Sequence, residues 1–125
     1  MYETLAMLKP GASYSADELY RLVYDLARYE LYVERDGDLI RLVVGDAWLG
    51  ISWSDAPHII EESDEIAGQF GIPCRGCHIR IEMSGDDPGM DLFNHYLIIN
   101  EKLQATGKFV IFDSQQCKLM FEDGE

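Results

Sequence analysis

Long hydrophobic runs and basic residues are both scarce in this chain. Its uncharged apolar runs are only a few residues long, as at Leu97–Ile99, whereas a helix that spans a bilayer needs about 20 apolar residues. Only 10 residues are Lys or Arg, against 23 Asp and Glu, and the formal net charge is −13. Such a chain repels phosphate, and no Lys/Arg run offsets the repulsion. We therefore expect neither membranes nor nucleic acids among its partners.

The chain also lacks the marks of a secreted, disulfide-bonded protein. Its first residues, Met1-Tyr2-Glu3-Thr4, do not form the basic segment that precedes a long apolar stretch in a secretory signal. Its three cysteines are odd in number and suit reduced thiols better than a disulfide framework. These features predict a cytoplasmic protein.

The residues that are present are sufficient for one hydrophobic core. A chain of 125 residues has the commonest length of a single domain, and 47% of its residues are hydrophobic. Neither repeats nor Pro/Gly-rich linkers divide it. We expect residues 1–125 to form a single acidic α+β domain.

Turn residues and apolar spacing predict the secondary structure. Ser15 and Glu18 have the spacing of a capping box and precede a helical apolar pattern that continues to about residue 29. Further helices are expected at 57–70 and 90–105. Asp36-Gly37 between two apolar runs is typical of a β-hairpin. Strands are expected at 3–9, 31–35, 39–44, 48–53, 78–83, 109–112 and 119–121.

The predicted order, βαβββαβαββ, mixes hairpins with helices. It indicates an α+β fold in which an antiparallel-dominated sheet carries about three helices, and a derivative of the ferredoxin-like fold is one form that this order could take. The apolar positions that fit these elements predict the core. We expect it to consist mainly of Leu22, Val23, Leu26, Val43, Leu49, Ile51, Ile81, Phe93, Tyr96, Leu97 and Phe112.

The sharpest motif in the chain is a Cys-x-x-Cys-His pattern. Cys74, Cys77 and His78 match the pattern that attaches c-type haem, but that pattern normally lies on a helix of an exported protein. The two thiols could instead share a zinc ion, with His78 and Cys117 as completing ligands, or act as a redox pair. Zinc needs four ligands, and this segment follows a predicted helix rather than opening one. We therefore favour a structural loop without metal or cofactor.

Catalytic motifs are equally hard to find. His58, His78 and His95 are widely spaced, and none lies in a metalloprotease or nucleophile-elbow sequence. The acidic segment at 85–89 lacks the ligand spacing of an EF-hand, and Asp87 fits better as the cap of the third helix. We assign no catalytic residue.

Four carboxylates within five residues distinguish the second predicted helix. They are Glu61, Glu62, Asp64 and Glu65. No Lys or Arg occurs from Pro57 to Pro73 to relieve their repulsion. The cluster is either a solvated face of an acidic protein or a surface that steers and pairs with a basic partner.

Small size and high acidity resemble the general profile of the immunity-protein class, small acidic cytosolic proteins that neutralise basic toxins or nucleases. The resemblance implies a non-catalytic domain, immunity- or inhibitor-like, that presents its carboxylate-rich helix to a basic protein. Two alternatives stay open at this point: a metal or redox module built on Cys74 and Cys77, and a small enzyme without a visible motif. A deep pocket with convergent polar groups would favour the enzyme.

Overall fold

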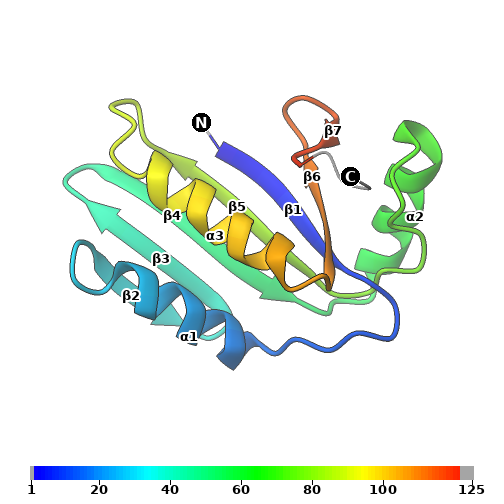
Figure 1. Ribbon diagram of the computed structural model, residues 1–125, viewed down its shortest axis with the longest axis horizontal. Coiled ribbons are helices and arrows are strands. Elements are labelled where there is room, and N and C mark those ends of the chain that lie inside the picture. Colours follow the sequence, from blue (N-terminus) through cyan, green and yellow to red (C-terminus); the bar gives the residue numbers. More distant parts are fainter. Residues whose placement is uncertain (1, 122–125) are drawn as a thin grey trace.

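Seven strands form one sheet in the computed structural model, which describes residues 2–121. Their order is β2-β3-β4-β5-β1-β6-β7, and every neighbouring pair is antiparallel (Figure 1). The strands are β1 (Tyr2–Leu8), β2 (Tyr32–Asp36), β3 (Leu39–Val44), β4 (Ala47–Ser54), β5 (Arg80–Asp86), β6 (Phe109–Asp113) and β7 (Lys118–Leu119). The first strand in the chain therefore lies inside the sheet, between β5 and β6.

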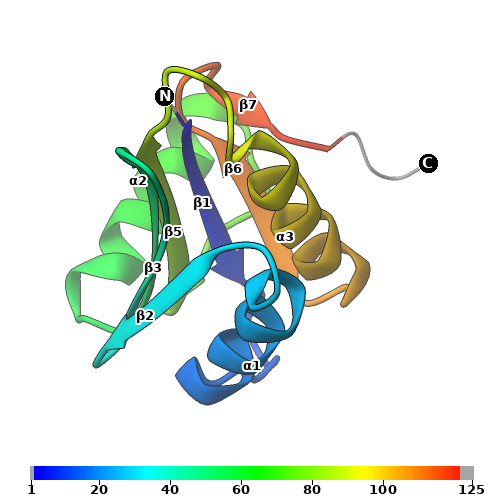
Figure 2. The same ribbon diagram turned by 90° about the vertical axis from the view of Figure 1, so that its left-hand side faces the viewer.

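Three helices pack on the two faces of this sheet. Helices α1 (Ala16–Ala27) and α3 (Phe93–Ala105) lie side by side on one face, and α2 (His58–Phe70) lies on the other (Figure 2). Helix α1 begins at the predicted capping box, in which the Glu18 N–H donates to Ser15 Oγ and the Ser15 N–H donates to Glu18 Oε1. No helix formed by residues 2–121 has the length and apolarity needed to cross a membrane.

The predicted fold class and element order are confirmed, whereas the narrower ferredoxin-like derivation stays a hypothesis. Most boundaries differ from the prediction by one or two residues, and two larger differences have a clear cause. Strand β5 continues through Ser84–Asp86, because these residues pair with β4. Helix α3 begins at Phe93 rather than near residue 90, because Met90 adopts a left-handed φ of 59° that interrupts a helix.

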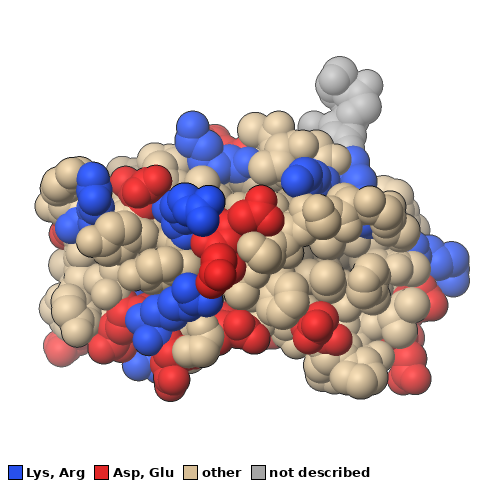
Figure 3. Space-filling view, turned by 90° about the horizontal axis from the view of Figure 1, so that it is seen from below, with Lys and Arg blue, Asp and Glu red and all other residues tan. Residues whose placement is uncertain are grey.

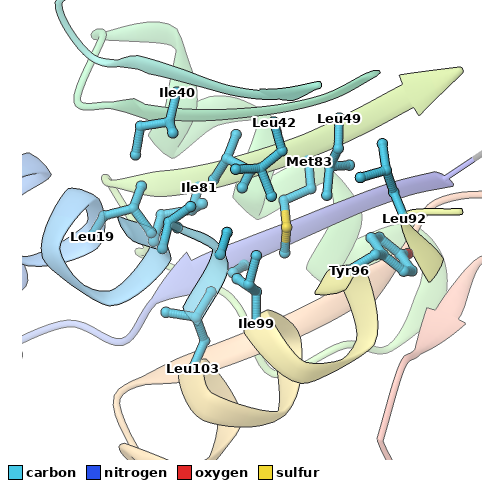
Figure 4. Packing of buried hydrophobic residues seen from close by; sticks show 14 of the residues in the cluster. Leu19, Ile40, Leu42, Leu49, Ile81, Met83, Leu92, Tyr96, Ile99 and Leu103 are labelled. Carbon is cyan, nitrogen blue, oxygen red and sulfur yellow. The ribbon is translucent and has the colours of Figure 1, made fainter. Parts of the chain in front are cut away.

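The main core lies between the sheet and the helices α1 and α3 (Figure 4). Six of the predicted core residues are buried: Val23, Leu49, Ile51, Ile81, Tyr96 and Phe112. Leu22, Leu26, Val43, Phe93 and Leu97 are only half-buried. For α3 the prediction misplaced the inner face, which runs along Tyr96, Ile99, Asn100 and Leu103.

A second, smaller core lies beneath α2 on the opposite face of the sheet. Met7 of β1 and Val110 and Phe112 of β6 meet Ile72, Cys74 and Cys77 from the segment that follows α2. Within residues 2–121 no second core covers the outer side of β2–β4, where Tyr32, Arg41 and Trp48 are exposed. Helix α2 and the loop that follows it therefore cover only part of this face of the sheet.

Candidate functional site

The four predicted carboxylates of α2 fall into two pairs with different surroundings. Glu62 forms an ion pair with Arg80 of β5, whose side chain is only 14% exposed. The Gly76 N–H donates to Asp64 Oδ1 at 2.8 Å. Glu61 and Glu65 are exposed and form no ion pair within residues 2–121. Only this second pair is free to meet a partner.

Helical geometry explains only part of this division. Ile59 and Ser63 are the buried residues of α2, so the inner side of the helix passes through them. At about 100° per residue, Glu62 lies about 80° from the centre of that inner side, next to β5, whereas Asp64 lies about 120° from it and is distinguished by its hydrogen bond from the Gly76 N–H. Glu61 and Glu65 are four residues apart and share the outer side.

The premise that nothing relieves the repulsion on this helix is therefore wrong for Glu62 and Asp64. Arg80 and the Gly76 N–H supply the missing positive charge and donor, and both come from segments beyond the helix. A search restricted to the helix sequence does not find them.

An exposed apolar residue accompanies the outer carboxylates. Ile60 is 41% exposed, adjacent to Glu61 and one helical turn before Asp64. Large apolar side chains surrounded by charged groups are common in protein interfaces, which have an apolar centre and a polar rim. The outer side of α2 combines these two kinds of surface.

The structure separates the four candidate metal ligands. Cys74 and Cys77 are free thiols buried in the small core, whereas Cys117 is exposed in the turn between β6 and β7 and His78 is exposed. The Cys74 thiol donates to the Ser63 carbonyl at 3.1 Å. Within residues 2–121 no group of three His, Cys, Asp or Glu side chains is placed to hold a metal ion.

Burial also makes the two thiols poor nucleophiles. It raises the pKa of Cys77 to about 11, with Cys74 and Asp64 as further causes. Burial and the nearby Asp64 carboxylate likewise raise the pKa of Cys74. Since the thiolate is the reactive and metal-binding form, this environment favours a structural role for both residues.

Thiol reactivity provides a direct check on this assignment. In native protein at pH 8 we expect a disulfide reagent such as DTNB to modify Cys117 first, and Cys74 and Cys77 at least about tenfold more slowly, because their thiolate fraction is small and their access is blocked. Mass spectrometry of the modified peptides would give each rate. Urea-unfolded protein is the control, in which all three should react alike. Equal rates in native protein would contradict the assignment.

No family model, curated protein or solved structure matches this chain.

The histidines offer no catalytic arrangement in the described part of the chain. His58, at the start of α2, and His78, before β5, are both exposed. His95 Nε2 lies 2.9 Å from Glu30 Oε1, which connects α3 to the turn that follows α1.

One cavity brings polar groups together far from the predicted site. It has a volume of 490 Å³ and is lined by Asp87, Pro88, Met90, Phe93, Tyr96, Asp113, Gln115, Gln116 and Met120. No His, Cys, Lys or Ser lies among these lining residues of the described chain. The cavity therefore offers acceptors and apolar contacts but not the usual nucleophile and base of a catalytic pair.

Proposed function

We propose that the protein is a non-catalytic binding domain that presents the outer side of α2 to a basic protein, in the manner of an immunity protein or inhibitor. The observation that carries the proposal is the placement of Glu61 and Glu65. Both point away from the core, neither has a cationic partner within residues 2–121, and the exposed Ile60 lies beside them.

Electrostatics supports a basic partner over an acidic one. The net charge of −13 attracts a cationic protein during diffusional encounter and repels nucleic acid. On the face shown in Figure 3, Lys and Arg side chains are interleaved with Asp and Glu, so no continuous basic surface is available there for phosphates. The exclusion of nucleic acid is part of the same proposal.

A cytoplasmic setting also belongs to the proposal. All three cysteines are free, and the burial of Cys74 and Cys77 in the small core is compatible with reducing conditions.

The double substitution Glu61→Gln/Glu65→Gln tests the role of α2. We expect it to lower the association rate with a basic partner by roughly threefold to tenfold at low salt and to flatten the salt dependence, while the dissociation rate changes less. Stability should rise by only a few tenths of a kcal/mol, because a like-charge pair one turn apart is removed. Wild-type protein would be used to capture partners from the source cell. Stopped-flow measurements at several ionic strengths would then give the association and dissociation rates of each partner with the wild-type and variant proteins.

The matched control is Asp25→Asn/Glu101→Gln, which removes the same net charge from the exposed surfaces of α1 and α3. It should reduce the association rate less than the α2 variant does. If both double variants associate at the same rate at every salt concentration, the outer side of α2 is only a solvated surface.

A further inference from the structure

Strand β6 has an open edge, because β7 lies beside only one end of it (Figure 1). The last hydrogen bond between the two runs from the Met120 N–H to the Ile111 carbonyl. Within residues 2–121 no strand pairs with Phe109 or Val110 on this side. Such an edge can take up a further extended chain, which adds to the sheet as another strand.

The alternation of the β1–β6 ladder shows where the backbone groups of Phe109 point. The Lys9 N–H donates to the Lys108 carbonyl across this ladder, and an antiparallel pair forms its hydrogen bonds at every second residue. Val110 therefore also bonds to β1, whereas the N–H and C=O of Phe109 point to the open side. Neither group has a hydrogen-bond partner within residues 2–121, although Phe109 is only 3% exposed. Since buried backbone groups are rarely left unpaired, both favour a ligand that brings a donor and an acceptor.

A cavity of 340 Å³ lies over this open edge and is called here the β6 edge groove. Phe109–Ile111 of β6 line it, and its walls come from both faces of the sheet. Gln104 of α3 and Phe121 form the wall on the side of the main core, whereas Pro73 and Leu119 form the wall on the side of the small core. The volume lies within the range of about 300–1,000 Å³ that is typical of ligand pockets. The groove therefore has room for a short peptide segment.

One end of the groove carries a positive charge. Lys9 is the only charged residue among those that line the groove within residues 2–121. Its side chain is exposed and forms no ion pair in this part of the chain. Lys9 lies two residues after Met7 of the small core, so it projects toward the same side of the sheet as the wall formed by Pro73. A carboxylate on the ligand would meet this ammonium group.

The opposite edge of the sheet, β2, is protected by charge. Glu34, Arg35 and Asp36 of β2 are exposed, and the first two form ion pairs with Arg41 and Asp17, respectively. Charged side chains along an edge strand discourage the addition of another strand. Strand β6 is therefore the edge that favours strand addition.

We infer that the β6 edge groove binds a short extended segment of another protein, which adds to the sheet in line with β7. The central residue of this segment lies opposite Phe109 and exchanges two hydrogen bonds with it, while its side chain faces Gln104 and Phe121. Antiparallel pairing, which all neighbouring strands of this sheet use, places the preceding residue opposite Val110 and the following residue opposite Lys108.

These positions predict the sequence that the groove prefers. The side chain opposite Val110 faces Pro73 and Leu119 and should be apolar, as should the central one. The side chain opposite Lys108 faces Lys9 and should be acidic. The inference goes beyond the proposed function, because it uses neither α2 nor the net charge of the partner.

The peptide acetyl-Val-Leu-Glu-amide follows this order and tests the inference. We expect it to shift the NMR signals of the Phe109 amide and the Leu119 methyl groups saturably, and to slow hydrogen exchange at Phe109. N-methylation of the central leucine removes the N–H that would donate to the Phe109 carbonyl and should weaken binding at least about tenfold. The matched control is N-methylation of the glutamate, whose N–H points away from β6, and affinity should stay within about twofold. No saturable shift, or equal effects of the two methylations, would overturn the inference.

Variants of the protein test the charge at the end of the groove. We expect Lys9→Gln to weaken the peptide by about threefold, because an exposed ion pair is lost. The matched control Lys102→Gln removes the same charge from the exposed surface of α3 and should leave the affinity unchanged. A peptide with glutamine in place of glutamate should bind the wild type and Lys9→Gln equally. Unchanged affinity of the glutamate peptide for Lys9→Gln would refute the acidic position.

Two measurements separate this groove from other occupants and from α2. Sedimentation equilibrium should show a monomer, and a dimer that the peptide dissociates would make a second copy of the chain the occupant and overturn the choice of another protein. Glu61→Gln/Glu65→Gln should bind the peptide as the wild type does, since neither residue lines the groove. Peptide binding that persists while this variant leaves partner association unchanged would refute the role of α2 and keep the groove.

Discussion

Replacing Gly85 by alanine is expected to lower the free energy of unfolding by about 3 kcal/mol. Gly85 is buried in β5, opposite Leu49 of β4. A Cβ at this position would lie 2.4 Å from the Trp48 carbonyl oxygen and 3.0 Å from Leu49 Cα. Both atoms belong to the backbone of β4, so a strand in the middle of the sheet would have to move.

Gly50→Ala is the matched control for this substitution. Gly50 is also buried in the sheet, but its added Cβ would meet the Trp48 ring at 3.4 Å and the Ser84 carbonyl oxygen at 3.6 Å, which are close to ordinary contact distances. We expect a change within about 1 kcal/mol. Urea denaturation followed by circular dichroism would measure both variants. Similar losses for the two would show that β4 and β5 do not approach each other as closely as described.

Truncating Ile99 to alanine is expected to cost about 2–5 kcal/mol, because its side chain is fully buried between α3 and the sheet and would leave a cavity. Leu97→Ala should cost no more than about 1.5 kcal/mol, since Leu97 is half-buried and lies outside the main core cluster. Thermal and urea unfolding of both variants would measure these two losses in the free energy of unfolding. A loss for Leu97→Ala equal to that for Ile99→Ala would return the inner face of α3 to the position predicted from sequence.

Local signals explain why the secondary structure could be predicted. The Ser15–Glu18 capping box and the Gly71 stop act within a few residues and occur where the sequence indicates, and the hairpin turn falls at Gly37-Asp38, one residue beyond the predicted Asp36-Gly37 pair. Gly37 and Gly71 adopt positive φ angles of 63° and 70°, which glycine tolerates.

The inner face of α3 could not be predicted in the same way. Leu97, Ile98 and Ile99 are consecutive apolar residues, so helical periodicity does not choose among them. Packing of α3 against the sheet and α1 determines which of the three is buried: Ile99 is fully buried, and Ile98 remains exposed.

The candidate sites depend on contacts between distant segments. Arg80 is 18 residues from its partner Glu62. Asp87 and Asp113 line the same cavity because β5 and β6 flank β1 on its two sides and both run antiparallel to it, so their ends lie at the same side of the sheet. No pattern within one element encodes that strand order. Sequence analysis therefore identified the acidic helix but neither the internal contacts of Glu62 and Asp64 nor the cavity.

The position of β1 inside the sheet has a consequence for biosynthesis. This strand leaves the ribosome before the other elements of residues 2–121, yet its neighbours β5 and β6 follow 83 and 109 residues later, since Tyr2 pairs with Gly85 and Thr4 with Asp113. Such a high contact order makes folding slow, because long loops must close before the central pairing is gained. The nascent chain must carry β1 as an unpaired apolar strand until its partners β5 and β6 have been synthesised. Mutual repulsion between strongly acidic chains helps to keep neighbouring copies apart during that interval.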